Sequence, residues 1–407
     1  MEKILKQRKI ILACSSLGLL VFGIAYAFSM FTVPLSLAYN LQMSDIALTF
    51  NIIMICFILG AYASTFVLAK IGLRYTIIIG GSLYLIGFCS TSLFSYDSIF
   101  SVYIFYGCLT GVGYGFGYNT IIATTNAWFP DKIGFASGVQ MMSVGFGSLF
   151  LGTAAANLIP TLGIQNVFIG IGVIAFLVVL GISFVIKQAP KDIQKLVKPR
   201  KNSGEKINYK NELPVKTPIY YLYSIWTVSI LAIGVTVIGT VAYDAQSLGV
   251  SVAHATLLVG IVSLFNGYAR IAIGVLYDKT GLKTVMTRNS ALAITACAAA
   301  AIAFSTSAAF LYVIAALIAA CSYGGCPVIA SAFTNKRYGA KNFGRNLSII
   351  NFTVIAGSLL SMALLAVVGK GSNQKLLFVI FLGLAVVGLL SLIPFFKKLN
   401  HDVKMLR

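Results

Sequence analysis

The chain has 407 residues, of which 58% are hydrophobic and only 10% are charged. A soluble domain carries about 25% charged residues, and a water-soluble fold of this length would lack the polar groups needed to cover its surface. The composition therefore excludes an ordinary soluble protein. It predicts a membrane protein, because lipid tolerates an apolar exterior.

The formal net charge of +20 would also suit a nucleic-acid-binding protein. However, Lys and Arg gather in short gaps between apolar runs and at the termini, and no basic helix is interleaved with exposed aromatic residues. We therefore expect no nucleic-acid partner. The charge instead fits membrane topology and attraction to anionic membrane lipid.

The sequence shows no catalytic or metal-binding constellation. All seven cysteines lie inside apolar runs, and none makes a metal-ligand pair with a nearby histidine. No Ser-His-Asp set and no phosphate-binding loop is visible. We expect no metal, no cofactor and no enzyme activity.

The N-terminus resembles a secretion signal but is better explained as a membrane helix. A cleavage after Ala13 would leave four residues between Lys9 and Cys14, whereas the apolar region of a signal needs about 7–15 residues. The apolar run also continues to about Leu37. It therefore predicts a first transmembrane helix that stays in the mature protein.

Twelve apolar runs are long enough to cross a bilayer, which takes about 20 residues of helix. A basic stretch rich in Lys, Asn and Pro, residues 187–216, divides them six and six. We predict an all-α membrane protein with a six-helix bundle over 1–187, a cytoplasmic linker over 188–217 and a second bundle over 218–407. The expected spans are 10–37, 45–69, 75–95, 98–127, 135–158, 163–187, 219–243, 253–277, 284–306, 308–335, 345–369 and 374–396.

The basic residues also predict the orientation. With a cytoplasmic N-terminus, the cytoplasmic segments hold all but three of the 30 Lys and Arg, since Lys370 and Lys375 fall outside and Arg270 falls within a span. We therefore expect both termini to lie in the cytoplasm. Separately, we expect a monomer in the plasma membrane.

One loop motif occurs twice, at the same place in each half. After the eighth span the chain reads Gly274-Val-Leu-Tyr-Asp278-Lys279-Thr-Gly281-Leu-Lys283, and after the second it reads Lys70-Ile-Gly72-Leu-Arg74. Glycine permits the tight turn, the basic residues anchor the loop at the cytoplasmic side, and Asp278 can cap a neighbouring helix end. Such a repeat indicates a duplicated transporter.

This loop resembles the signature G-x-x-x-D-[RK]-x-G-x-[RK] of the major facilitator superfamily. The second copy matches it throughout, whereas the first has Thr65 and Ala69 at its Gly and Asp positions. Further segments resemble the oxalate/formate antiporter and monocarboxylate transporter branch. They are Tyr26 to Pro34 in span one, the run Gly111-Val-Gly-Tyr-Gly-Phe-Gly117-Tyr118-Asn119, the run Trp128 to Gly138, and Phe265-Asn266-Gly-Tyr-Ala-Arg270.

The resemblance implies roles for particular residues. In that branch an arginine of span eight binds the substrate carboxylate, which corresponds to Arg270, and tyrosines of spans one, four and ten line the cavity. The matching positions here are Tyr26, Tyr118 and Tyr323, with Asn119 beside them. Oxalate exchangers of the branch also carry a lysine in span eleven, where this chain has Val354 at or next to the matching position. A monoanion is therefore favoured over a dianion.

Arg270 is also a candidate on physical grounds alone. It lies eight residues before Asp278, about 12 Å into a hydrocarbon core of about 30 Å, where an arginine costs about 2.5–3.5 kcal/mol. The sequence places no acidic residue in mid-span, because Asp45, Asp97 and Asp244 all fall near the outer boundaries. We therefore expect its counter-ion to be the substrate, since a guanidinium matches a carboxylate with two parallel hydrogen bonds.

Asn266 lies one turn from Arg270 on the same helical face. Its amide either donates a hydrogen bond to the same anion or joins two membrane helices, and both interpretations stay open.

These observations predict a secondary transporter for a small organic anion of the lactate, pyruvate or formate type. Transport proceeds by alternating access, with a proton or a counter-transported anion as the coupling partner. One alternative is a bulkier amphipathic anion such as a conjugated bile acid or a drug. Another is a non-transporting membrane sensor, which the short C-terminal tail disfavours.

Overall fold

The structure is a computed structural model that describes residues 2–41, 43–94, 98–190, 193, 213–339, 342–368 and 373–405. Three features of the sequence analysis lie outside these residues: Asp97, Lys370 and most of the predicted linker, residues 194–212. Everything that follows concerns the described part of the chain.

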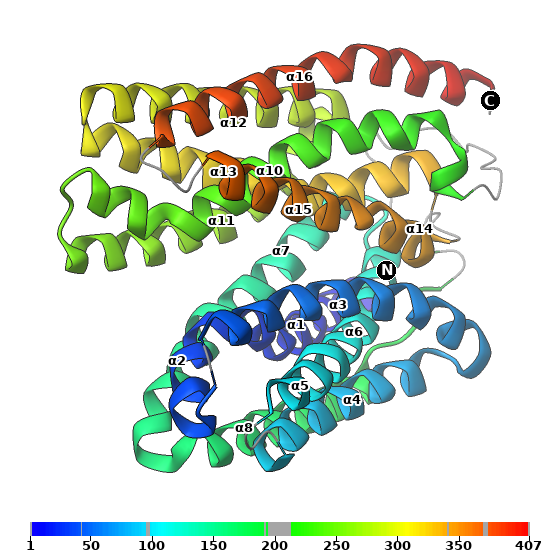
Figure 1. Cartoon of the computed structure of the whole chain (residues 1–407). Coiled ribbons are helices and arrows are strands. Elements are labelled where there is room, and N and C mark those ends of the chain that lie inside the picture. Colours follow the sequence, from blue (N-terminus) through cyan, green and yellow to red (C-terminus); the bar gives the residue numbers. More distant parts are fainter. Residues whose placement is uncertain are drawn as a thin grey trace. The chain divides into compact units, whose positions relative to one another are not determined.

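Twelve helical segments are long and apolar enough to cross a membrane, and no strand occurs in the described residues. This confirms the predicted all-α membrane architecture. A helix satisfies its own backbone groups, which lipid cannot do. The helices are α1 (Glu2–Phe22), α2 (Phe28–Tyr39), α3 (Met43–Ile71), α4 (Leu73–Phe94), α5 (Ile99–Val102), α6 (Gly111–Trp128), α7 (Ile133–Phe146), α8 (Thr153–Val185), α10 (Pro218–Ser247), α11 (Val252–Thr280), α12 (Leu282–Thr306), α13 (Ala309–Tyr338), α14 (Phe343–Ile350), α15 (Phe352–Val368) and α16 (Gln374–Met405) (Figure 1).

Several spans that the sequence predicts as continuous α-helices contain irregular turns. Span one passes through a 3₁₀ segment, η1 (Gly23–Ala27), while spans four and five contain the π-helical segments η2 (Tyr103–Thr110) and η3 (Gly147–Gly152). Gly163, with φ of 76°, separates span five from span six within α8. In span eleven, α14 and α15 are separated at Asn351. Hydropathy reports the length of a span but not its helical repeat, so these turns were not predictable from it.

By internal contacts the chain forms two compact units. Unit 1 comprises residues 1–130 and 139–198, and unit 2 comprises residues 131–138 and 199–407. The first turns of α7 therefore group with unit 2, whereas the rest of α7 groups with unit 1.

Unit 1 is packed around aromatic rings. Tyr114 stacks on Phe57 with ring centroids 4.4 Å apart, and Tyr84 meets Phe22 edge to face at 5.2 Å. A second group of rings, Phe28, Phe88, Tyr106 and Phe168, continues this core. Each ring of this size buries a large apolar area.

Unit 2 combines rings with hydrogen bonds between its helices. Tyr223 stacks on Phe333 at 4.3 Å, and the indole N–H of Trp226 donates to Ser290 Oγ at 2.8 Å. Thr236 and Ser361 join α10 to α15 through their hydroxyl groups, 2.7 Å apart. These polar contacts hold together helices that are apolar on both faces.

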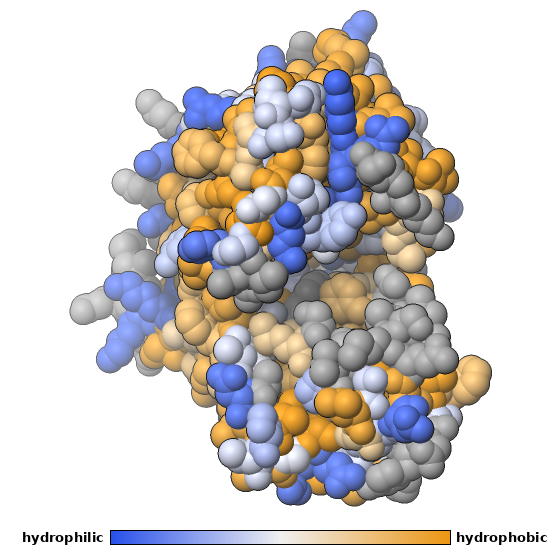
Figure 2. Space-filling view, turned by 60° about the vertical axis from the view of Figure 1, so that its left-hand side comes forward, coloured by the Kyte–Doolittle hydropathy of each residue, from blue (hydrophilic) through white to orange (hydrophobic). Residues whose placement is uncertain are grey.

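Large apolar side chains remain exposed along many spans, including Leu37, Phe100, Phe310, Val367 and Ile393. Figure 2 shows hydrophobic residues over much of the face that it displays. A soluble monomer rarely exposes so much apolar surface. The chain is therefore a multi-pass membrane protein whose surface meets lipid.

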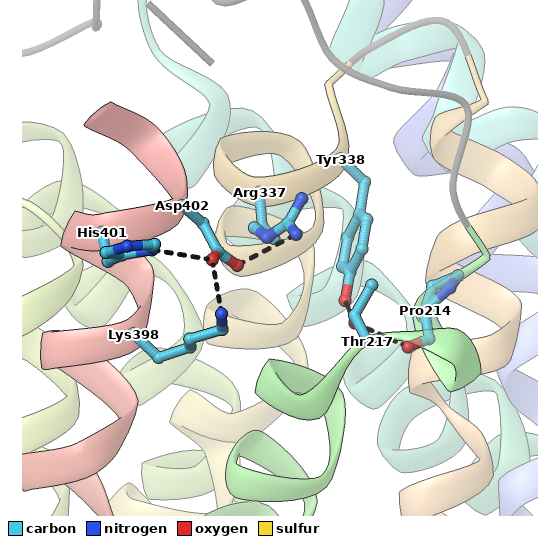
Figure 3. A network of polar contacts seen from close by, with 7 residues as sticks. All are labelled: Pro214, Thr217, Arg337, Tyr338, Lys398, His401 and Asp402. Carbon is cyan, nitrogen blue, oxygen red and sulfur yellow. Dashed lines mark hydrogen bonds and ion pairs between the residues drawn. The ribbon is translucent and has the colours of Figure 1, made fainter. Parts of the chain in front are cut away.

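A cluster of charges joins the last helix to the end of α13. Asp402 of α16 accepts a hydrogen bond from Arg337 Nη2 at 3.0 Å and lies 3.1 Å from Lys398 Nζ (Figure 3). His401 Nδ1 approaches the same carboxylate at 3.8 Å. One acid thus offsets two cations, Arg337 and Lys398, at the end of the bundle that we predict to be cytoplasmic.

Candidate functional site

The predicted anion-binding residues of unit 2 lie on α11 and α13, which pack against each other. Arg270 lies about 15 Å along α11 from Thr280, where the span ends, and about 20 Å from Leu257, where it begins. This position is near the middle of the span, as the sequence predicted. Arg270 is half-buried, so its guanidinium is not sealed within the bundle.

The backbone at Arg270 is held by a close helix contact. A Cβ added at Gly138 of α7 would lie 2.6 Å from the carbonyl oxygen of Arg270. One turn earlier in α7, Gly134 is in similarly close contact with the backbone of Gly274. The pair of glycines four residues apart is a small-residue motif that lets two membrane helices approach. This contact sets the position of Arg270 relative to the first turns of α7.

Asn266 lies where α11 meets α13. A Cβ added at Gly324 would lie 2.7 Å from Asn266 Oδ1, so only glycine fits beside this amide. The Oδ1 atom is buried and accepts no hydrogen bond from the described residues. The geometry is compatible with both readings of the sequence, a helix-contact amide and a donor to a bound anion.

Tyr323 lies directly before that glycine on α13. Its ring covers Gly234 of α10, because a Cβ at Gly234 would collide with the ring atoms Cγ and Cδ2 at 2.6 and 2.5 Å. Tyr323 is half-buried. Within unit 2, Asn266 thus lies at the contact of α11 with α13, and Tyr323 lies at the contact of α13 with α10. Arg270 lies one turn along α11 from Asn266.

The predicted residues of unit 1 lie on α6 and in η1. Tyr118 is 8% exposed and meets the rings of Phe57 and Tyr114 edge to face, at 5.1 and 5.6 Å. Tyr26 belongs to the 3₁₀ segment η1, and its side chain lies outside the described residues.

Asn119 is almost fully buried and joins two helices. Its Nδ2 donates to the carbonyl oxygen of Ala61 at 2.9 Å and to Ser64 Oγ at 3.2 Å, both on α3. Both amide hydrogens are thereby engaged within unit 1. A substrate contact through Asn119 stays a prediction, and only its Oδ1 atom is open to make one.

The signature loop of unit 2 caps a helix. Asp278 accepts hydrogen bonds from the backbone N–H groups of Gly134, at 3.0 Å, and Phe135, at 2.8 Å. These groups are unpaired donors of the first turn of α7, where a negative charge also complements the helix dipole. This is the helix-end contact that the sequence predicted for Asp278. Its role in gating stays a prediction.

The two copies of the loop share one backbone feature and differ in another. Gly72 and Gly281 both have φ of +83°, a conformation that favours glycine, so the turn itself is duplicated. Lys70, Lys279 and Lys283 are exposed, whereas Arg74 lies over the ring of Phe184, with the guanidinium carbon 3.7 Å from the ring centroid. Ala69 offers no carboxylate to cap a helix in unit 1.

Sequence reasoning missed a buried acid. Span seven was predicted to end at residue 243, but α10 continues to Ser247 and therefore includes Asp244. The side chain of Asp244 is 0% exposed. The sequence signal is Thr240 four residues earlier, on the same helical face, where a hydroxyl reaches the carboxylate. No group of three or more potential metal ligands occurs in the described residues.

This geometry describes a multi-pass membrane protein with a charged group in mid-span and a duplicated loop, which is the class of secondary transporters. The Major Facilitator Superfamily model matches residues 15–362 and, again, residues 228–404. The chain belongs to this superfamily, as the signature loop predicted.

Two curated relatives cover most of the chain. An uncharacterized MFS-type transporter, YhjX of Escherichia coli K12, is 25% identical over 338 residues, which is 83% of this chain and 82% of the relative. The oxalate:formate antiporter of Oxalobacter formigenes is 26% identical over 336 residues, 80% of this chain and 77% of the relative. Both are consistent with the predicted branch.

Solved structures share the fold at low sequence identity. The proton:xylose symporter XylE aligns with a TM-score of 0.75 at 15% identity, covering 95% of each chain. The transporter FucP in its outward conformation aligns with a TM-score of 0.71 at 12% identity, covering 95% of this chain and 98% of FucP. These similarities establish the fold and leave the substrate to be argued from the residues.

Proposed function

We propose that the protein transports a small organic monocarboxylate across the plasma membrane by alternating access, with Arg270 binding the carboxylate. The observation that carries this proposal is the half-buried arginine in the middle of an apolar span. A cation at that depth is costly, and intramembrane charges mark substrate paths. The relationship to an oxalate:formate antiporter supports an anionic substrate of similar size.

The chemistry of the neighbouring residues supports a single carboxylate. A guanidinium binds a carboxylate through two parallel hydrogen bonds, and Asn266, one turn away, carries amide hydrogens that can complete the shell. Within unit 2, Tyr323 offers an aromatic surface that favours an organic anion over a hydrated inorganic one. Tyr26 and Tyr118 of unit 1 stay proposed substrate contacts from the resemblance to the transporter branch. At Val354, half-buried in α15 just after the interruption at Asn351, the chain lacks a second cation for a dianion.

The loop Gly274 to Lys283 belongs to the same proposal as a gating element. Asp278 holds the first turn of α7 through two hydrogen bonds, and this turn also packs on the helix that carries Arg270. Breaking those bonds would release α7 from α11 next to the anion site. Both termini lie in the cytoplasm in this proposal, at the side of the basic loops.

The test is uptake into proteoliposomes of labelled formate, lactate and pyruvate, with oxalate as the dianionic comparator. We expect transport of at least one monoanion and weaker transport of oxalate. Arg270→Ala should abolish uptake. Arg270→Lys should raise the half-saturating concentration at least tenfold, because an ammonium cannot form the paired contact and losing a buried charge contact costs about 2–5 kcal/mol.

Arg288→Ala is the matched control, because Arg288 is an exposed arginine on α12 and should keep full activity. No transport of any monoanion, or full activity of Arg270→Ala, would overturn the proposal. Competition by anions of increasing size separates it from transport of a bulkier amphipathic anion, which would be indicated if large anions compete and small ones do not.

A further inference from the structure

A buried acid lies within unit 2, away from the residues proposed to bind the anion. Asp244 of α10 is 0% exposed, and its Oδ2 accepts hydrogen bonds from Thr240 Oγ1 at 2.6 Å and from Tyr312 Oη at 2.8 Å. Tyr312 belongs to α13 and is also 0% exposed. The second carboxyl oxygen, Oδ1, is buried and has no hydrogen-bond partner in the described residues.

Beyond the hydroxyl groups of Thr240 and Tyr312, the surroundings of this acid offer little to stabilise a negative charge. Side chains between α10, α12, α13 and α16 line a small void next to Tyr312, and apart from Tyr312 and Cys297 they carry no polar atom. An isolated carboxylate in such a medium is costly, whereas the protonated acid is not. Within the described residues Asp244 forms no ion pair, which agrees with a neutral resting form.

The helices packed around α10 bring few other titratable or charged groups to this end of the bundle. His254, at the start of α11, bonds with Ser251 and is exposed, and Lys375, at the start of α16, is exposed as well. The described parts of α12 and α15 carry no charged residue near the end of the bundle where Asp244 lies. Lys216 precedes the start of α10 and therefore lies at the opposite end. Tyr312 is thus the titratable side chain in direct contact with Asp244.

The hydrogen-bond pattern accommodates both protonation states. Thr240 Oγ1 has one hydrogen but two acceptors in reach, Asp244 Oδ2 at 2.6 Å and the carbonyl oxygen of Thr236 at 3.0 Å. When Asp244 is ionised, Thr240 donates to the carboxylate. When it is protonated, the acid can donate to Thr240, which then donates to Thr236. A proton is therefore gained or lost by reorienting one hydroxyl, with no unpaired donor left in either state.

The two helices that hold this pair also form a wall of the proposed anion site. Gly234 lies on α10, about 15 Å from Asp244, and its partner Tyr323 lies on α13, about 16 Å from Tyr312. A change in the contact between Asp244 and Tyr312 therefore acts on the same two helices that meet at Gly234 and Tyr323. The structure thus links the acid to the site by packed helices.

We propose that Asp244 is the proton-binding group of the transporter, so that each anion moves together with a proton. This inference rests on the proposed function at Arg270. In the cycle, the carboxylate takes a proton from water to form the neutral acid and returns it to water on the other side, with no other bond formed or broken. The coupling is then proton symport rather than exchange of one anion for another.

The experiment compares two modes of transport of labelled pyruvate in proteoliposomes. In the wild type, an imposed gradient of one pH unit should sustain about a tenfold accumulation for one proton per anion. Asp244→Asn is isosteric with the neutral acid and should lose this accumulation while it keeps counterflow of pyruvate without a gradient. Counterflow and an unchanged thermal unfolding curve show that the variant is folded.

Asp402→Asn is the matched control, because Asp402 is an acid of unit 2 at the end of α16 and should keep the gradient-driven accumulation. Gradient-driven accumulation by Asp244→Asn equal to that of the wild type would overturn the inference. So would a wild type that shows counterflow but ignores the pH gradient, and in that case the proposed function at Arg270 would stand.

A second measurement needs no substrate and separates the two proposals. The infrared difference spectrum of wild type minus Asp244→Asn should contain the carbonyl band of a protonated carboxylic acid at neutral pH. If pyruvate and the other monoanions are not transported but this band is present, the proposed function fails while the proton site is supported. Absence of the band at neutral pH and below overturns the proton site.

Discussion

Unit 1 and unit 2 share one repeated loop turn, at Gly72 and Gly281, yet they stabilise their interiors in different ways. Unit 1 packs ring against ring, and its helices deviate into the 3₁₀ segment η1 and the π-helical segments η2 and η3. In unit 2, described spans other than span eleven are regular α-helices, and chemical groups such as Arg270, Asp244 and Asp278 lie on them. The comparison indicates that unit 1 is distinguished by ring packing and irregular helices, whereas unit 2 is distinguished by charged side chains on its spans.

The signature loop shows the same division at a single position. Both copies turn at a glycine with the same φ, at Gly72 and Gly281, but only unit 2 has the carboxylate that caps α7. The turn is thus preserved for geometry in both halves. The charged contact is present in the half that also carries the mid-span arginine.

The largest effect should come from the glycine contact next to Arg270. Gly138→Ala places a methyl group 2.6 Å from the carbonyl oxygen of Arg270, so the backbone of α7 or α11 must move, at a cost of about 3 kcal/mol. Gly145→Ala on the same helix meets nothing within 4 Å and should stabilise by up to about 1 kcal/mol through helix propensity. Thermal unfolding of the purified variants measures both.

Equal melting temperatures for the two variants would show that the contact between α7 and α11 is looser than the structure has it. A lower melting temperature for Gly138→Ala, together with weaker anion binding, would support a role of this contact in positioning Arg270.

An intermediate effect is expected from the helix cap. Asp278→Ala removes two hydrogen bonds to a charged acceptor and should cost about 2 kcal/mol of stability. Asp278→Asn keeps one acceptor oxygen and should lose about half as much. Ala69→Asp, at the equivalent exposed position of unit 1, should change stability by less than about 0.5 kcal/mol.

These three variants are compared by thermal unfolding under identical conditions. A loss for Ala69→Asp as large as that for Asp278→Ala would contradict the difference between the two loops.

The smallest effects concern hydroxyl groups in the aromatic core of unit 1. The hydroxyl of Tyr106 is buried without a hydrogen-bond partner in the described residues, so Tyr106→Phe should stabilise by about 1 kcal/mol. The hydroxyl of Tyr84 donates to the carbonyl oxygen of Phe22 at 3.2 Å, so Tyr84→Phe should destabilise by about 1 kcal/mol. Changes of the same sign in unfolding experiments would contradict the different hydrogen-bonding states of these two hydroxyl groups.

Much of the fold could be predicted from the sequence because membrane insertion depends on local properties. A run of apolar residues predicts a span wherever it occurs, and the basic residues beside it predict its orientation. The position of Arg270 within its span followed from counting residues back from Asp278. The repeat of the loop at Gly72 and Gly281 was visible as a pattern of residue types.

The candidate site could be predicted only in part, since a residue's type does not reveal its neighbours. Asn119 was predicted beside the substrate and stays a prediction, while the structure adds that its amide hydrogens are directed at Ala61 and Ser64 of α3. Asp244 lies near the end of α10, as predicted, but its burial and its contact with Tyr312 of α13 were not visible in the sequence. In both cases the deciding contact comes from another helix.

Twelve spans, a duplicated loop and an arginine in mid-span can be predicted from the sequence, because they depend on hydropathy and charge along the chain. Which groups those residues touch depends instead on how the helices pack. Asp278 meets donors 143 and 144 residues away, and Asp244 meets a hydroxyl 68 residues away. Such partners depend on how closely two helices approach, and glycines such as Gly134, Gly234 and Gly324 set that distance.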